Sequence, residues 1–111
     1  MSNLAQRSCE PCTGNTPRLT GDLLKELLRE LSGWQVSGDE KSIRKAFEFK
    51  DFHHTMAFVN AVAWVAHRED HHPTLEVSYK RCEVVYFTHA IDGLSENDFI
   101  CAAKIDRLLS S

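Results

Sequence analysis

The spacing of the apolar residues changes at His71-His72-Pro73, and this change is the strongest constraint on the fold. Residues 52–66 carry apolar side chains at helical spacing. Residues 74–79 instead alternate between polar and apolar side chains, which is typical of a half-buried strand. Because the residue before a proline avoids the α conformation, the helix should end at or before His72. The two histidines should therefore stand on irregular backbone at a helix exit, where loops often carry chemistry.

Three helices are predicted from periodicity and from their capping residues. Thr20 precedes a leucine-rich stripe that ends at Ser32-Gly33, and Asp51 precedes the second helix. Ser95, with Asp98 three residues later, resembles a capping box before the third helix.

Two hairpins are predicted between these helices. Residues 34–36 and 43–49 pair around a turn, and residues 74–79 and 82–88 pair around a tight connection at Lys80-Arg81. The element order is therefore α-β-β-α-β-β-α. It predicts a single-domain α+β fold, with a four-stranded antiparallel sheet and helices packed on one face.

Length and composition fit one globular domain. The chain has 111 residues, of which 42% are apolar and 26% charged, with a net charge of −3. No basic stripe indicates nucleic-acid binding, and no apolar run is long enough to span a membrane. The N-terminus lacks the pattern of a secretory signal, so we expect a cytoplasmic location. Residues 1–18 are polar and predict a flexible N-terminal arm, followed by the folded domain at 19–111.

The four cysteines divide into two pairs. Cys82 and Cys101 fall within regular patterns and are expected to be small buried hydrophobes. Cys9 and Cys12 have the Cys-x-x-Cys spacing of metal and redox sites, but a structural zinc site needs four ligands and no second such motif exists. A flexible tail without bound metal is the favoured interpretation.

The second helix is apolar on much of its circumference. Phe52, Met56 and Val59 begin one row, and Phe58 and Val62 belong to another. We expect this helix to be largely buried against the sheet and against another subunit. An uncovered sheet edge would also favour pairing between subunits, so a homo-oligomer is predicted.

Three histidines should converge at one end of the second hairpin. If that hairpin is tight, His72 and His89 lie side by side, with His71 next to them. Histidine exchanges protons near neutral pH, and Asp70 could fix a tautomer. This constellation indicates an acid–base site rather than three surface histidines.

Metal binding is the competing chemistry. His67 and His71 have the i,i+4 spacing of helical zinc ligands, and His89 or Asp70 could complete a site. Arg68 follows His67, however, so the His-Glu-x-x-His pattern is absent. No metal is therefore predicted. His53 and the neighbouring His54 have no chemical partners nearby and are expected to be solvated.

The chain resembles the pterin-4a-carbinolamine dehydratases from about Leu23 to its C-terminus. The matching residues are Asp70-His71-His72-Pro73, Tyr79, His89, the stretch 93–98 and the Phe47-x-Phe49-x-Asp51-Phe52 segment. The resemblance implies dehydration of a 4a-hydroxytetrahydropterin to the quinonoid dihydropterin and water. This reaction recycles the pterin cofactor of aromatic amino-acid hydroxylases. No metal or organic cofactor is implied, because the pterin is itself the substrate.

The resemblance also implies roles for residues. His71 and His89 would be the acid–base groups, His72 would bind the pterin and assist proton removal, and Asp70 would orient the histidines. The implied catalytic residues are His71, His72, His89 and Asp70, and the implied substrate-binding residues are His71, His72, Pro73, Thr88, His89, Ala90 and Ile91. Two positions depart from many members: His67 replaces an acidic residue and Leu75 an aromatic one. These changes would alter the pH optimum and substrate preference.

The implied partners are a pterin, further copies of this chain in a dimer or tetramer, and a functionally linked hydroxylase. Two alternatives remain open from the sequence. The chain could act as a dimerisation cofactor for another protein through its apolar second helix, or as a histidine-based metal-binding protein.

Overall fold

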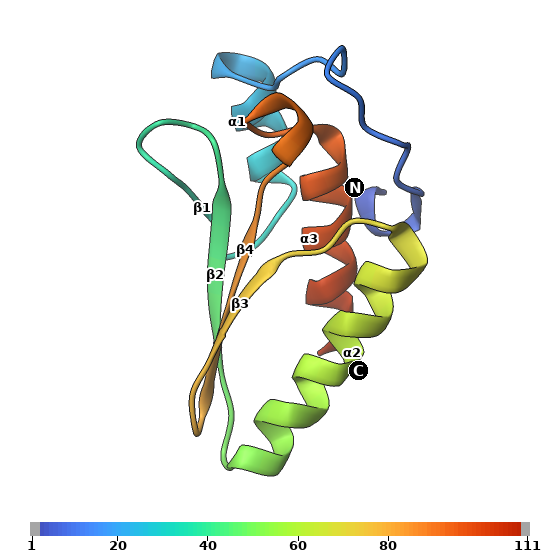
Figure 1. Cartoon of the computed structure of the whole chain (residues 1–111). Helices are drawn as coiled ribbons and strands as arrows, with labels where there is room; N and C mark the ends of the chain where they lie inside the picture. Colours follow the sequence, from blue (N-terminus) through green and yellow to red (C-terminus); the bar gives the residue numbers. More distant parts are fainter. Residues whose placement is uncertain (1–2, 110–111) are drawn as a thin grey trace.

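The computed structural model describes residues 3–109 and has the predicted order of helices and strands (Figure 1). The α-helices are α1 (Gly21–Arg29), α2 (Phe52–Glu69) and α3 (Glu96–Leu108). The strands are β1 (Gln35–Val36), β2 (Ile43–Glu48), β3 (Thr74–Val77) and β4 (Arg81–Tyr86). Two short 3-10 helices, η1 (Leu4–Gln6) and η2 (His89–Ile91), were not expected. The predicted α+β class is confirmed.

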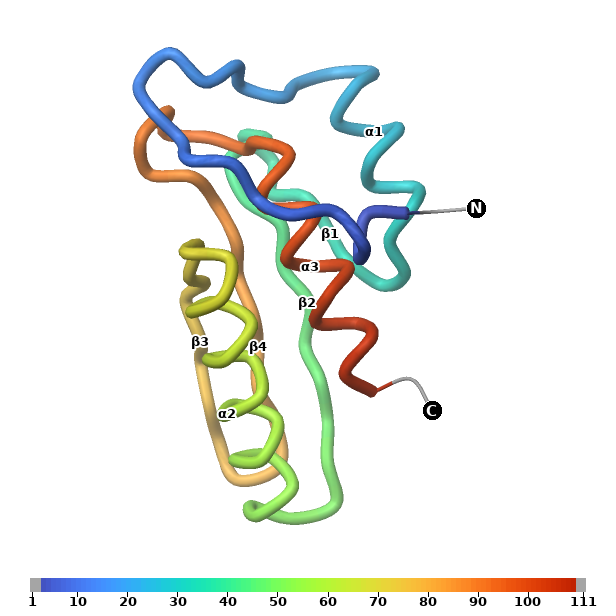
Figure 2. Tube along the Cα trace, turned by 90° about the vertical axis from the view of Figure 1, so that its right-hand side faces the viewer, coloured from blue at the N-terminus to red at the C-terminus, as the bar shows by residue number. Residues whose placement is uncertain are grey.

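The four strands form one antiparallel sheet in the order β1-β2-β4-β3. The long strands β2 and β4 pair at its centre, from Ile43 opposite Tyr86 to Glu48 opposite Arg81. Figures 1 and 2 show α2 and α3 next to each other on the same face of this sheet. The predicted one-sided packing is therefore confirmed.

The core lies between the sheet and these helices because the strands alternate. In β4, Cys82, Val84 and Tyr86 are fully buried and their neighbours are only partly buried. On α3, Cys101 is also fully buried. The expectation that Cys82 and Cys101 are small buried residues is confirmed.

The turn of the second hairpin lies one residue earlier than predicted. Val77 pairs with Cys82, and the Ser78 N–H donates to the Arg81 carbonyl at 2.8 Å. Tyr79 and Lys80 are therefore central in the turn, and the prediction of a connection at Lys80-Arg81 was wrong. The reason is long-range register, since Arg81 already pairs with Glu48 of β2.

Helix α2 buries one face within the chain. Thr55, Phe58 and Val62 face the core, whereas the side chains of Phe52 and Trp64 are 44% and 61% exposed. The prediction of a largely buried helix is therefore correct for one face of a single chain. A contact between its other face and a second subunit stays a prediction.

The N-terminal arm, residues 3–18, lies against α3 and the start of the domain (Figure 2). Leu4 is only 1% exposed and belongs to the hydrophobic core. The Lys104 ammonium donates to the Ala5 carbonyl at 2.9 Å, and Arg18 donates to the Ile91 carbonyl. These contacts give the arm a defined place, and its flexibility stays a prediction.

The described residues omit the first two residues of the predicted arm and the last two of the predicted domain. Residues 1–2 and residues 110–111 therefore lie outside the described range. Between residues 3 and 109, no helix is both long and apolar enough to cross a membrane.

Replacing Phe58 with alanine should reduce the free energy of unfolding by about 3–5 kcal/mol, because a buried aromatic ring leaves a cavity. The Phe58 ring packs 4.6 Å from Phe47 and 5.1 Å from Phe49. Phe52→Ala on the same helix is the matched control and should cost less than about 1 kcal/mol, since that residue is 44% exposed at the surface. Urea denaturation measures both, and equal losses would contradict the packing described.

Candidate active site

The end of α2 releases the two adjacent histidines from the helix. Asp70 caps the helix in the left-handed conformation, with φ of 51° and ψ of 43°. Aspartate visits this region more readily than most residues. The His71 N–H then donates to the Ala66 carbonyl at 3.1 Å, which closes the last turn. The helix therefore ends before His71, as the position of Pro73 predicts.

The second hairpin brings the third histidine to the same place. Strands β3 and β4 pair from Thr74 opposite Val85 towards the turn. Beyond β4, Thr88 bridges Gly93 and leads into η2, which starts at His89. The His72 and His89 rings lie 6.3 Å apart between centroids. The predicted convergence of the histidines is confirmed.

The three histidines line one cleft with a volume of about 440 Å³. The other expected site residues along it are Asp70, Thr88 and Ala90. Pro73 lies instead in an adjoining hollow of about 420 Å³, next to Leu75 and His67. Ile91 is nearly buried and lines neither space, and its carbonyl accepts hydrogen bonds from Arg18.

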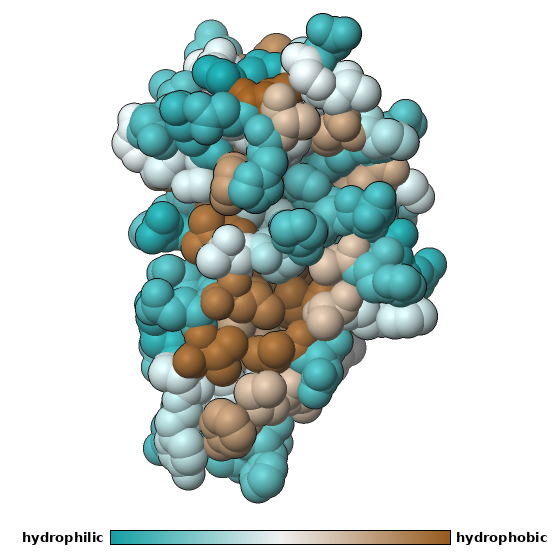
Figure 3. Space-filling view, viewed as in Figure 1, coloured by the Kyte–Doolittle hydropathy of each residue, from teal (hydrophilic) through white to brown (hydrophobic). Residues whose placement is uncertain are grey.

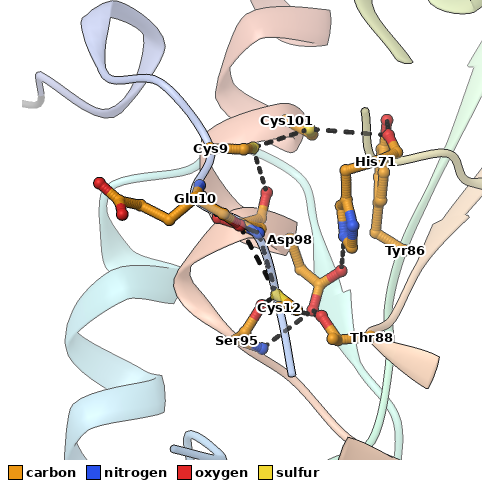
Figure 4. Close-up of polar contacts among 10 residues, drawn as sticks. Cys9, Glu10, Cys12, His71, Tyr86, Thr88, Ser95, Asp98 and Cys101 are labelled. Atoms are coloured by element: carbon orange, nitrogen blue, oxygen red, sulfur yellow. Dashed lines mark hydrogen bonds and ion pairs between the residues drawn. The ribbon is translucent and has the colours of Figure 1, made fainter. Parts of the chain in front are cut away.

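A buried carboxylate that the sequence did not assign to the site holds His71. The Nε2 atom of His71 lies 2.6 Å from Oδ1 of Asp98, whose side chain is fully buried (Figure 4). The second oxygen, Oδ2, accepts hydrogen bonds from the Thr88 hydroxyl at 2.8 Å and the Ser95 N–H at 2.9 Å. Asp70, expected in the orienting role, lines the cleft, but the carboxylate bonded to the His71 ring is that of Asp98.

Besides its place in the matching stretch 93–98, Asp98 carried a local signal in the sequence. Its spacing from Ser95 marks a capping box, and the Ser95 N–H does donate to it. A capping carboxylate has two oxygens, and here the cap uses only one of them. The other is therefore available to His71, which is 27 residues away in the chain.

The surroundings of His71 favour its protonated form. Burial alone would lower its pKa, but the hydrogen bond and negative charge of Asp98 outweigh burial and raise the pKa above 6.5. The ring stacks on Tyr86 at 5.3 Å between centroids, and the Tyr86 hydroxyl donates to the His71 carbonyl at 3.2 Å. Both ring and backbone of His71 are thus fixed.

The other titratable rings lie in different settings. His89 packs against Phe87, with 4.2 Å between the ring centroids. His67 packs near Trp64 at 5.6 Å, on the side of the adjoining hollow. Within residues 3–109, no group of three or more histidine, cysteine, aspartate or glutamate side chains is placed to hold a metal ion. The prediction of a site without metal stays a prediction.

The N-terminal arm supplies a wall of the cleft that the sequence did not indicate. Residues 9–12 line it together with the histidines. The Asn97 side chain fixes this segment, accepting from the Glu10 N–H at 3.1 Å and donating to the Glu10 carbonyl at 2.6 Å. The Cys9 N–H donates to the Glu69 carboxylate at 2.8 Å. The arm thus takes part in the cleft through backbone contacts, which leave little trace in a sequence.

Comparison with known proteins gives one consistent result. The family model described as pterin 4 alpha carbinolamine dehydratase matches residues 17–108. A protein of Nitrosospira multiformis, provisionally named pterin-4-alpha-carbinolamine dehydratase, is 57% identical over 97% of this chain and 94% of its own length. A provisionally named dehydratase from Legionella pneumophila strain Corby is 52% identical, covering 97% of this chain and 96% of the relative.

Solved structures agree with the fold. The crystal structure of a transcriptional coactivator/pterin dehydratase from Brucella melitensis superposes with a TM-score of 0.79 at 36% identity, covering 83% of this chain and 98% of that one. The structure of a pterin dehydratase-like protein identified as a RuBisCO assembly factor in the alpha-carboxysome superposes with a TM-score of 0.63 at 23% identity, covering 72% of this chain and 93% of that one. The second likeness concerns the fold alone.

Asp98→Asn should lower the pKa of His71 and flatten the pH dependence of stability. The raised pKa means that the His71–Asp98 pair stabilises the fold fully below pH 6.5 and loses that contribution as pH rises through the pKa of folded His71. We expect the free energy of unfolding of the wild type to exceed that of the variant by about 2 kcal/mol at pH 6, and this difference should become smaller towards pH 9. Urea denaturation and histidine NMR titration measure this, and a difference in unfolding free energy that is constant with pH would contradict it.

Asn97→Ala should loosen the arm. Loss of the two side-chain bonds to Glu10 should speed hydrogen exchange of the Glu10 amide by about tenfold or more. Asn60→Ala, an exposed asparagine on α2, is the matched control and should leave that exchange rate unchanged. Equal exchange rates in both variants would show that Asn97 does not hold the arm.

Proposed function

The chain belongs to the pterin-4a-carbinolamine dehydratase family, and from this premise we propose that it dehydrates 4a-hydroxytetrahydrobiopterin to quinonoid dihydropterin. One observation carries the proposal. One cleft is lined by His71, His72 and His89, and the buried carboxylate of Asp98 contacts the His71 ring at Nε2. The reaction would recycle the pterin cofactor of an aromatic amino-acid hydroxylase.

The reaction needs one proton donor and one proton acceptor. The bond between the 4a carbon and its hydroxyl oxygen breaks, and the oxygen leaves as water once it has received a proton. The adjacent ring nitrogen loses its proton, and its electron pair forms the new carbon–nitrogen double bond. Water and the quinonoid dihydropterin balance the substrate, so an enzyme has only to move protons and hold the ring.

His71 is suited to donate the proton. The Asp98 charge raises its pKa above 6.5, so a larger share of the imidazole is protonated near neutral pH. Its contact with Asp98, at 2.6 Å, and its stacking on Tyr86 fix the ring direction. We assign Asp98 as a positioning residue that acts through His71.

His89 and His72 complete the acid–base set in this proposal. The His89 ring lies 6.3 Å from the His72 ring between centroids and packs on Phe87. His89 acts with His71 at the 4a-hydroxyl, and His72 binds the pterin and assists proton removal. Asp70, Thr88 and Ala90 line the same cleft and contribute to binding. No cofactor takes part, because the substrate is a spent cofactor.

A homo-oligomer in the cytoplasm belongs to the same proposal. Figure 3 shows apolar surface where α2 meets the sheet, and the adjoining hollow there is lined by Val62, Ala63, Ala66 and Leu75. Trp64 of the same helix is 61% exposed. The alternative role, as a dimerisation cofactor for another protein, would use this same surface. A pull-down with the wild type and a Trp64→Ala variant tests it, and finding only self-association would remove the alternative.

The decisive experiment is turnover of freshly generated 4a-hydroxytetrahydrobiopterin. The wild type should accelerate its decay, and single replacement of His71 or His89 with alanine should reduce kcat/KM by about 10²–10⁴-fold. The double variant should approach the uncatalysed rate. His53→Ala, an exposed histidine at the start of α2 and outside the cleft, is the matched control and should retain wild-type turnover. Undiminished turnover in the double variant would refute the assigned roles.

A further inference from the structure

Two thiols that the proposed dehydration does not use lie in contact beside the cleft. The Sγ atoms of Cys9 on the arm and Cys101 on α3 are 3.5 Å apart, although 92 residues separate them (Figure 4). Both cysteines are free. The pair therefore joins the arm to the domain at a point that also borders the site.

The structure holds the two sulfurs in place from both sides. The Cys9 N–H donates a hydrogen bond to the Glu69 carboxylate, and the Glu10 N–H donates one to the Asn97 side chain, so the arm is fixed. Cys101 lies within α3, and its side chain is fully buried. Cys9 is only half-buried and lines the cleft, so a small oxidant in the cleft reaches it. The two sulfurs are therefore in contact with each other, and one of them is accessible from the cleft.

The electrostatic surroundings of the two sulfurs differ. The hydrogen bond from Cys9 lowers the pKa of Cys101, and the neighbouring His71 charge lowers it further against the effect of burial. The same hydrogen bond and burial raise the pKa of Cys9. Cys101 is therefore the more readily ionised of the two thiols.

We propose that Cys9 and Cys101 are a modification site that a peroxide converts to an intramolecular disulfide, which fixes the arm as a wall of the cleft. One thiol takes an oxygen from hydrogen peroxide to become a sulfenic acid, and one water is released. The second thiol attacks that sulfur, the S–S bond forms, and the oxygen leaves as a second water. Two thiols and one peroxide thus give one disulfide and two waters.

The required movement is small. A disulfide needs about 2.05 Å between the sulfurs, so the pair closes by roughly 1.5 Å. Cys12, the other cysteine of the Cys-x-x-Cys motif, is held elsewhere, with its sulfur accepting a hydrogen bond from Asn97 at 3.0 Å. The observed contacts therefore favour pairing of Cys9 with Cys101 over pairing of Cys9 with Cys12.

The test uses the full-length protein, reduced, desalted and exposed to a small excess of hydrogen peroxide. Peptide mapping without reduction should show a linked Cys9–Cys101 peptide and a mass loss of about 2 Da. The melting temperature should rise by at least about 5 °C, since the bond closes a long loop, and dithiothreitol should reverse the shift. Cys12→Ser should behave as the wild type does, and Cys9→Ser should show neither change.

Three results would overturn the proposal: a Cys9–Cys12 bond, a bond between two chains, or oxidation of single cysteines to sulfinic acid without any bond. Cys9→Ser alters a half-buried residue of the arm, so it removes the bond and leaves the buried Cys101 unsubstituted. The readouts are covalent and thermal and do not depend on turnover. A failed dehydration assay therefore leaves this proposal standing, and the reverse holds as well.

Discussion

The arrangement of the cleft depends on one buried carboxylate, that of Asp98. A buried charge is stable only when its partners satisfy it, and Asp98 has three: His71, Thr88 and Ser95. These partners come from the exit of α2, the segment after β4 and the start of α3. A single group thereby sets the relative positions of three elements that approach the cleft, and the same group raises the pKa of His71.

This dual use explains why the candidate site sits where it does. The capping box starts α3 with one oxygen of Asp98 and leaves the other for the histidine. Local helix chemistry and site electrostatics are therefore linked through one side chain. The arm adds a second layer, because Asn97, adjacent to Asp98 in the sequence, holds Glu10 at the edge of the cleft. The first turn of α3 thus positions both His71 and the arm segment at Glu10.

Much of the fold followed from local patterns. The strand after Pro73, the break at Pro73 and the caps at Asp51 and Ser95 have short-range signals, and the structure confirms them, although the strand ends at Val77 rather than at Tyr79. The convergence of His72 and His89 followed from assuming a tight hairpin. The roles of these histidines stay a proposal that rests on the resemblance and on their shared cleft.

What the sequence did not reveal depends on long-range contacts. The one-residue shift of the turn follows from pairing of Arg81 with Glu48, which only the sheet register fixes. The contact of His71 with Asp98 and that of Cys9 with Cys101 depend on how α3 docks. Burial of Leu4 is equally a tertiary effect, since nothing in its polar surroundings marks it as a core residue.

The most direct test of the central claim is the pH profile of kcat for the wild type and the Asp98→Asn variant. If Asp98 keeps His71 protonated as the general acid, activity falls as pH rises through the His71 pKa, and in the variant this fall moves to lower pH. A profile whose alkaline limb is the same in both proteins would contradict the account.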